Sequence, residues 1–520
     1  GAIVTIVLCS VIAALMVLGT LADWYIEWLG AQKEARRAAR GEAAEGGEEA
    51  AGLTGANANA NADAAATAAA RGPPTRMEES AYRAGMACLR PMVVLKCFSI
   101  TYNFGRLFEH NPEATTALNG LRVLFISWVI LGHTNLYMMN VGLSNPTYVL
   151  DVLQRYSIGL ISGAEYSVDG FFFLSGFLVT FIAIKDLGRG NPFNAVKYYF
   201  HRYFRLTPSY AFTILFWATI ASYLGEGPFW ARFQDLPNPS CKKYWWTNLL
   251  YINNFWPAVY EDECFKWGWY LANDMQFYVV TPLFFLLFSK VRPIAGWLAL
   301  AAALLACIGS HLGIVLGYHL GLDSGDEYLD KLYAKPYIRA PSYIIGIAFA
   351  FAYYQTGDKF RVPKWLSLPL YAASLTLLWV ITYGKNDYFK HGQHWSNWTE
   401  SWMFDVFSPV CWTLALGCLC YLSFFGSGGV VRALLGHHMW TPLARLSYGT
   451  YLCQSMVIYV FTYGHHQYFH WAARTMSYYF VGNWVFSFLC SLVLYLAVEK
   501  PMMNLEGFAT GRIVRLPKAL

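Results

Sequence analysis

An arginine and a histidine lie eleven positions apart inside one apolar stretch, LRVLFISWVILGHT, which runs from residue 121 to 134. On a helix this spacing separates Arg122 from His133 by about 16 Å along the axis. If the helix starts at the cytoplasmic face, Arg122 lies near the lipid headgroups and His133 near the middle of the bilayer. An ionisable group at that depth is costly, which favours a functional site. The alternative is a neutral imidazole that serves only as a structural hydrogen-bonding group.

The segment SVDGFFFLSGF, residues 167–177, places a carboxylate at the start of another apolar stretch. Asp169 is expected either to orient a nearby imidazole, as carboxylates do for catalytic histidines, or to cap the helix. Ser175 lies one to two turns deeper and is assigned to an acceptor site. Its alternative role is close helix packing, together with Gly176.

A cationic run, KYYFHRYFRLTP, spans residues 197–208. Arg202 and Arg205 are three positions apart and share one helix face. With Lys197 they form a positive patch beside aromatic rings, and arginine forks bind phosphate in a bidentate manner. The patch therefore suits a nucleotide phosphate, although simple anchoring by the positive-inside rule is an alternative.

Polar side chains also begin two later apolar stretches, WYLANDMQFY at 269–278 and KPYIRAP at 335–341. Asn273, Asp274 and Gln276 are costly in a span unless they are paired, and Arg339 has the same problem. We expect these four side chains to face a polar cavity that holds a hydroxyl-bearing acceptor. The histidines at 465, 466 and 470 have no acidic or cysteine partner in sequence, so no metal is expected.

The composition predicts an all-α polytopic membrane protein. Of the 520 residues, 56% are hydrophobic and only 13% are charged, about half the charged share of a soluble domain. Apolar windows near 20 residues predict about eleven spans, at 2–23, 119–139, 170–188, 208–224, 270–289, 295–316, 337–354, 366–383, 403–425, 446–463 and 478–498. The net charge of +6 comes from short loops between spans, so a nucleic-acid partner is not indicated.

The lysines and arginines predict the orientation, with the first residue outside and the C-terminus in the cytoplasm. Two marks agree with this orientation. Asn397 begins an N-glycosylation triplet, which is used only on the luminal side, and Cys241 and Cys264 flank a loop on that side where a disulfide can form. The expected domains are a helix at 1–29, a disordered linker at 30–80, an interfacial segment at 81–118, a transmembrane domain at 119–506 and a tail at 507–520.

Taken together, these motifs resemble the acyltransferase-3 superfamily of membrane proteins. The arginine–ten–histidine pair, DGFFFLSGF and the Arg-x-x-Arg-x-x-Pro run occur in that family's order. The segments WVILGHT, WTNLLYINNF, WYLANDMQFY and KPYIRAPSYIIG are similar to its nose-resistant-to-fluoxetine-like branch. The resemblance covers about residues 89–506.

The resemblance implies a ten-helix fold that transfers an acyl group from cytoplasmic acyl-CoA to a lipid or carbohydrate hydroxyl. It makes His133 the essential histidine and associates Arg122 with donor binding. Arg202 and Arg205 would hold the coenzyme phosphates. The location expected is the endoplasmic reticulum or the plasma membrane. A transporter or binder of lipids or small hydrophobic molecules on the same scaffold is the alternative, and a structural subunit is a third possibility.

Two positions depart from the family pattern, which indicates a different acceptor site. Bacterial members usually have glutamate where Asp274 stands, and many relatives have a histidine near Gln454. The branch usually carries a cysteine-rich luminal domain before its first span, and this chain begins at Gly1 without one. We therefore expect a fragment or a processed chain.

Overall fold

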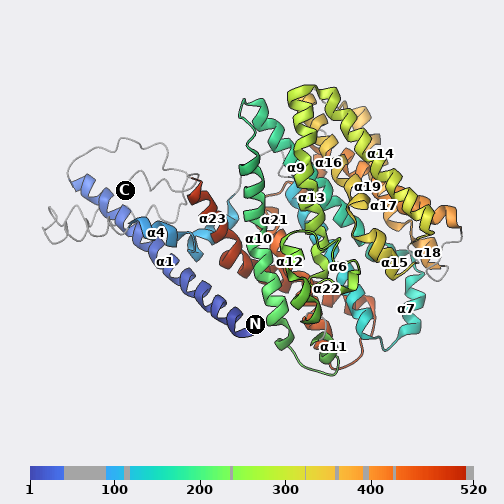
Figure 1. The fold of residues 1–520 in the computed structure, drawn as a ribbon, viewed down its shortest axis with the longest axis horizontal. Coiled ribbons are helices and arrows are strands. Elements are labelled where there is room, and N and C mark those ends of the chain that lie inside the picture. The colour runs from blue at the N-terminus through green and yellow to red at the C-terminus, as the bar shows by residue number, and fades with distance from the viewer. Residues whose placement is uncertain are drawn as a thin grey trace. The chain divides into compact units, whose positions relative to one another are not determined.

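The computed structural model describes residues 1–39, 89–109, 117–234, 238–321, 324–357, 362–390, 397–424 and 429–510 (Figure 1). Within these ranges the chain is helical, and the one pairing of extended segments is a bridge between Leu143 and Phe469. The predicted all-α class is confirmed. Residues 30–39 of the linker predicted at 30–80 belong to the helix that begins at Ala2, and residues 40–80 lie outside the described residues, as do the last ten residues of the tail.

The α-helices have the following bounds: α1 (Ala2–Ala39), α4 (Leu89–Lys96), α5 (Ile100–Phe108), α6 (Ala117–Val141), α7 (Pro146–Leu153), α8 (Gly159–Ser162), α9 (Tyr166–Gly188), α10 (Ala195–Thr219), α11 (Trp230–Gln234), α12 (Asn238–Leu249), α13 (Trp269–Leu286), α14 (Pro293–Tyr318), α15 (Asp326–Tyr328), α16 (Pro336–Thr356), α17 (Lys364–Tyr383), α18 (Asn386–Lys390), α19 (Trp398–Phe424), α20 (Gly429–Leu435), α21 (Trp440–Tyr463), α22 (Ala473–Leu494) and α23 (Lys500–Ala509).

Eight helical segments of the described residues are long and apolar enough to cross a membrane. They contain α1, α6, α9, α13, α14, α17, α19 and α22. The spans predicted at 208–224, 337–354 and 446–463 fall on α10, α16 and α21, which are helices but are not among the eight. The chain is an integral multi-pass membrane protein, and the predicted count of eleven spans is not confirmed.

Local sequence explains several helix starts. Pro293 and Pro336 occupy the first position of α14 and α16, where the missing N–H costs nothing and the fixed φ suits a helix. Asn194 caps α10, because its side-chain oxygen accepts a hydrogen bond from the Lys197 amide at 2.9 Å. This cap fixes where the cationic run begins to be helical.

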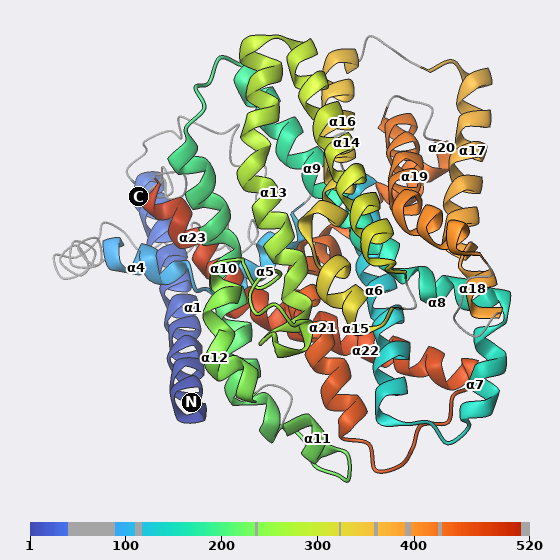
Figure 2. The ribbon, with the colours of Figure 1, turned by 45° about the vertical axis from the view of Figure 1, so that its right-hand side comes forward.

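The chain divides into two compact units, which we describe separately. The first unit comprises residues 1–2, 110–200 and 210–492. Its most extensive helix contact joins α9 to α16 (Figure 2). A Cβ at Gly176 would lie 2.3 Å from the Tyr343 carbonyl oxygen, and one at Gly346 would lie 2.3 Å from the Phe173 carbonyl oxygen. Only glycine therefore permits this backbone approach, a mode of packing typical of membrane helices.

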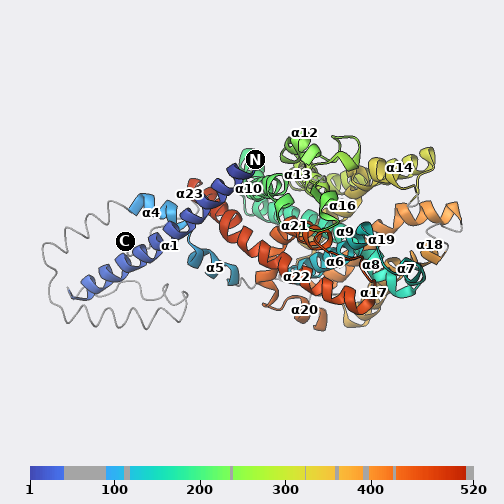
Figure 3. The ribbon, with the colours of Figure 1, turned by 90° about the horizontal axis from the view of Figure 1, so that it is seen from below.

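Aromatic side chains fill the core of the first unit. One cluster joins α6, α9, α16 and α19 through residues such as Phe125, Phe177 and Trp412, and another joins α9, α13, α14 and α16 through residues such as Phe172 and Phe351. In Figure 3, α6, α9 and α16 lie between the more peripheral α14 and α17. Polar side chains on α6, α9 and α16 are therefore held by rigid neighbours.

The second unit comprises residues 3–109, 201–209 and 493–520. Asp23 of α1 is buried and forms an ion pair with Lys96 at 2.6 Å, and it accepts a hydrogen bond from Ser99 at 2.8 Å. Asn504 of α23 donates hydrogen bonds to Asn103 and to the Cys97 carbonyl. These polar contacts join α1, α4, α5 and α23.

Candidate functional site

His133 lies half-buried on α6, about three turns beyond Arg122, which is also half-buried on that helix. Its Nδ1 lies 3.0 Å from Oε1 of Gln454 on α21. The Tyr137 ring stacks on the imidazole, with 5.0 Å between centroids and 11° between planes. The position that departs from the family pattern, Gln454, is therefore the side chain that contacts the candidate catalytic histidine.

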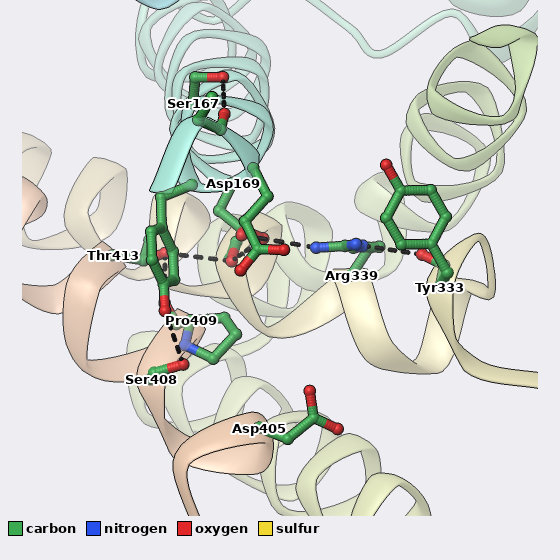
Figure 4. A network of polar contacts seen from close by, with 12 residues as sticks. Ser167, Asp169, Tyr333, Arg339, Asp405, Ser408, Pro409 and Thr413 are labelled. Atoms are coloured by element: carbon green, nitrogen blue, oxygen red, sulfur yellow. Dashed lines mark hydrogen bonds and ion pairs between the residues drawn. The ribbon is translucent and has the colours of Figure 1, made fainter. Parts of the chain in front are cut away.

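Asp169 lies in the first turn of α9, and its partners are on other helices (Figure 4). Ser342 of α16 donates a hydrogen bond to its Oδ1 at 3.0 Å, and Arg339 Nη1 lies 3.6 Å from its Oδ2. Thr413 of α19 in turn donates to Ser342 at 3.1 Å. The expectation that Asp169 orients His133 is wrong, because the hydrogen-bond partner of the imidazole is Gln454.

Arg339 is almost entirely buried and is held by more than its ion pair. Its Nε donates a hydrogen bond to the Tyr333 carbonyl at 3.0 Å. The guanidinium also lies over the rings of Trp269 and Tyr333, at 5.2 and 5.1 Å from their centroids. The predicted acceptor residue thus faces protein, with Asp169 as its counter-ion.

Sequence reasoning missed a second buried pair close to this network, although the signal was present. His311 of α14 and Asp405 of α19 each interrupt an apolar stretch, and the structure places Nε2 of His311 3.1 Å from Oδ2 of Asp405. The Tyr328 hydroxyl donates to Oδ1 of Asp405 at 2.8 Å. Lys385 and Glu165 form a further ion pair. Charged side chains therefore gather where α9, α16 and α19 begin and α14 ends.

Asp274 and Ser175 meet between α13 and α9. The Ser175 hydroxyl donates to Oδ1 of Asp274 at 2.5 Å, and the carboxylate is buried. The structure therefore brings together two of the predicted acceptor residues on facing helices.

Asn273 and Gln276 have different partners. Asn254 donates to Oδ1 of Asn273 at 3.0 Å and to Oε1 of Gln276 at 3.1 Å. Asn273 donates to the Ala334 carbonyl, and Gln276 donates to the Tyr251 carbonyl. The expectation that these amides bind an acceptor is corrected, because Gln276 bonds to the loop before α13, and Asn273 bonds to that loop and to the chain just before α16. Asn254, a residue of the WTNLLYINNF motif, is the centre of this contact.

A disulfide joins Cys264 of the same loop to Cys241 of α12, and the loop also carries a buried carboxyl group. Burial raises the pKa of Glu263 well above its usual range, although the Asn253 amide, which donates to Oε2 at 3.0 Å, and the charge of Lys335 oppose this shift. Burial lowers the pKa of Lys335, and the charge of Glu263 opposes that shift. The loop is thus a packed element with internal polar contacts.

The predicted phosphate-binding residues lie along α10. Lys197 is exposed, Arg202 is half-buried and Arg205 is exposed. Within the second unit, His201 Nδ1 lies 2.8 Å from Glu506, and Arg205 lies close enough to the buried Glu499 to interact electrostatically. The cationic run therefore has acidic neighbours of its own, Glu499 just before α23 and Glu506 within it.

Asn397 is exposed immediately before α19, and its side-chain oxygen accepts a hydrogen bond from the Thr399 amide at 3.0 Å. Among the described residues, no group of three or more His, Cys, Asp or Glu side chains has an arrangement that could hold a metal ion.

The sequence profile of the acyltransferase-3 family, described as an acyltransferase domain, matches residues 115–498. The chain is 28% identical to "Nose resistant to fluoxetine protein 6" of Caenorhabditis elegans over 448 aligned residues. The alignment covers 79% of this chain and 53% of that protein. The chain therefore spans about half the length of that relative.

Two further relatives show how widely the similarity extends. "Regulator of hypoxia-inducible factor 1" of the same species is 22% identical, over 82% of this chain and 87% of that protein. "O-acetyltransferase OatA" of Staphylococcus aureus is 24% identical, over 54% of this chain and 43% of that protein. No solved structure matches significantly.

Proposed function

Because this chain belongs to the acyltransferase-3 family of membrane proteins, we propose that it moves an acyl group from cytoplasmic acyl-CoA to the hydroxyl of a lipid or carbohydrate. The observation that carries the proposal is the half-buried imidazole of His133, fixed by Gln454 on a neighbouring helix. The likeness to a bacterial O-acetyltransferase supports an acyl transfer to oxygen.

In the proposed reaction the neutral imidazole of His133 acts as general base. It takes the proton of the acceptor hydroxyl as the oxygen attacks the thioester carbonyl carbon. The carbon–sulfur bond then breaks, and the imidazolium returns the proton to the coenzyme A thiolate. The net change is an ester and a free thiol in place of a thioester and an alcohol.

The donor site is assigned to the cationic residues. Arg202 and Arg205 would bind the coenzyme phosphates, with Lys197 earlier on the same helix contributing positive charge. Arginine suits this role because its planar guanidinium presents two parallel donors to a phosphate. On the acceptor side, the Ser175–Asp274 pair is the strongest candidate, because Asn273 and Gln276 are engaged with the loop.

The test uses the full chain, purified and reconstituted with membrane lipids, and radiolabelled acetyl-CoA as the probe. Release of the free thiol and transfer of label to the lipid extract are followed together. His133→Ala should lower the rate about 100- to 10,000-fold, the usual contribution of a general base. His466→Ala, an exposed loop histidine, is the matched control. An unchanged rate of acyl transfer in His133→Ala would show that the proposal is wrong.

A binder of small hydrophobic molecules is the second candidate, and one observation favours it. An open groove of about 780 Å³ on the surface of the first unit is lined by Trp128, Trp379 and Trp412 among other largely apolar residues. A binder of this kind needs no coenzyme site. Binding of labelled acetyl-CoA that is lost in the Arg202→Ala/Arg205→Ala double variant therefore favours the enzyme.

A further inference from the structure

His133 and three side chains around it form a closed ring of contacts. His133 Nδ1 faces Oε1 of Gln454 at 3.0 Å, and Nε2 of Gln454 donates to the Ser455 hydroxyl at 2.7 Å. The Ser455 hydroxyl lies 3.3 Å from the Tyr137 hydroxyl, and the Tyr137 ring stacks on the imidazole. Gln454 and Ser455 are completely buried, so water does not compete for these contacts.

We propose that Gln454 is a positioning residue that holds His133 in the tautomer with hydrogen on Nδ1. A carboxamide nitrogen only donates and its oxygen only accepts. Since Nε2 of Gln454 is used by Ser455, the atom that faces Nδ1 is an acceptor. Nδ1 must then carry the hydrogen, and the lone pair of the imidazole is on Nε2.

This ring of contacts leaves Nε2 as the reactive nitrogen. Within the described residues, the hydrogen bond to Gln454 is the one that His133 makes, and the imidazole is half-buried rather than enclosed. Tyr137 is itself stacked on Tyr459, at 4.3 Å and 14°, so the face of the imidazole is held by a column of rings. Gln454 thus does for His133 what a carboxylate does for the histidine of a hydrolytic triad, but without a charge.

A neutral partner has a chemical consequence. An amide oxygen fixes the tautomer without the strong stabilisation of imidazolium that a carboxylate gives, so the histidine stays neutral and ready to accept a proton. The catalytic meaning of this assignment rests on the proposed function, whereas the tautomer itself does not. The two can therefore be tested separately.

The first test is spectroscopic and needs no substrate. The full chain is labelled with ¹⁵N at its twelve histidines, reconstituted in lipid, and measured by solid-state NMR at about pH 8, above the ordinary histidine pKa of about 6.5. The His133 signals are those lost in His133→Gln. Hydrogen on Nδ1 supports the proposal. Hydrogen on Nε2 overturns it, because it means that the Gln454 carboxamide is turned end for end.

The second test uses variants with the acetyl-CoA assay. Gln454→Leu should lose the tautomer preference and lower kcat about 10- to 100-fold, with KM for acetyl-CoA little changed. Gln454→Glu should keep hydrogen on Nδ1 and shift the acid limb of the pH–rate profile upward by about one unit, because a carboxylate stabilises imidazolium. A merely structural role for Gln454 would leave the pH profile in place.

A matched control lies on the same helix. Among the residues that the structure describes, the Ser447 hydroxyl of α21 bonds to the Ala444 carbonyl one turn earlier and to no other group. Ser447→Ala should therefore behave as the unaltered chain. If Gln454→Leu retains both the tautomer and full activity, the proposal is wrong. If the unaltered chain shows the Nδ1 tautomer but transfers no acyl group, the positioning role of Gln454 stands and the proposed function falls.

Discussion

Arg339 of α16 and Asp169 of α9 form an ion pair between two almost completely buried side chains, with 3.6 Å between Nη1 and Oδ2. The pair connects the two helices with the most extensive contact in the first unit. Ser175 of the candidate acceptor site is also on α9, and Ser342 is on α16. The ion pair therefore helps to hold the helix that carries Ser175 in position. The contacts of this ion pair give it a structural role, because they join α9 to α16.

Breaking this pair should destabilise the protein. Asp169→Leu leaves Arg339 buried without a counter-ion, which typically costs about 3–5 kcal/mol. The double variant Asp169→Leu/Arg339→Met should regain most of that loss, because no uncompensated charge remains. Thermal unfolding in detergent measures both variants. Equal losses in the single and double variants would show that packing, not charge, dominates at this position.

The glycine contact between α9 and α16 gives a second prediction. Gly346→Val should lower stability by about 1–3 kcal/mol, the usual cost of overpacking, because a Cβ there meets the Phe173 carbonyl oxygen. Gly313 of α14 is the matched control, since nothing lies within 4 Å of a Cβ at that position. Gly313→Ala should be neutral or slightly stabilising, and comparable losses in both variants would contradict the packing argument.

The buried Glu263 predicts a pH-dependent difference in stability. Its pKa is raised in the folded state, so the unfolded chain ionises first as the pH rises above about 4.3. The carboxyl group therefore costs stability progressively as the pH rises from there through its folded pKa.

Glu263→Gln keeps an acceptor for Asn253 and removes this cost. Its advantage in unfolding temperature over the unaltered chain should be smallest near pH 4 and grow towards neutral pH. Glu261→Gln, at an exposed position of the same loop, is the comparison variant. A difference that stays constant with pH would argue against a buried neutral carboxyl group.

The glycosylation triplet tests the predicted orientation. In a eukaryotic host, the chain should lose apparent mass on treatment with an endoglycosidase, and neither Asn397→Gln nor Thr399→Ala should show this change. Asn397 is exposed just before α19, which leaves room for a glycan. Absence of a glycan on the unaltered chain would count against a luminal position for that loop.

The sequence predicts the helices well because apolar length alone decides whether a segment can cross a bilayer. Hydropathy does not identify α10, α16 and α21 as membrane spans, because polar residues lower their mean hydropathy. These residues, such as Arg205, Arg339 and Gln454, are the ones that make contacts between segments. The hydropathy signal is therefore weakest on helices that carry these contacts.

The candidate site was predicted in its residue types but not in its pairings. His133, Asp169, Asp274 and Arg339 were all singled out because charge inside an apolar stretch is costly. The same argument applies to His311 and Asp405, which were overlooked within long spans. Which charge meets which depends on how helices pack, so neither the Asp169–Arg339 pair nor the Gln454–His133 contact could be deduced from spacing along one helix.

The order of the paired charges along the chain affects how the protein is made. Arg339, the counter-ion of Asp169, follows it by 170 residues, and Asp405 follows its partner His311 by 94. During synthesis α9 reaches the bilayer before α16 has been made. The Asp169 carboxylate of α9 is therefore without its counter-ion, the Arg339 guanidinium of α16, until α16 is inserted. Insertion of the early helices is thus completed only when the later ones arrive, and a nascent chain that is cut short before α16 is left with an uncompensated acid in its membrane segment.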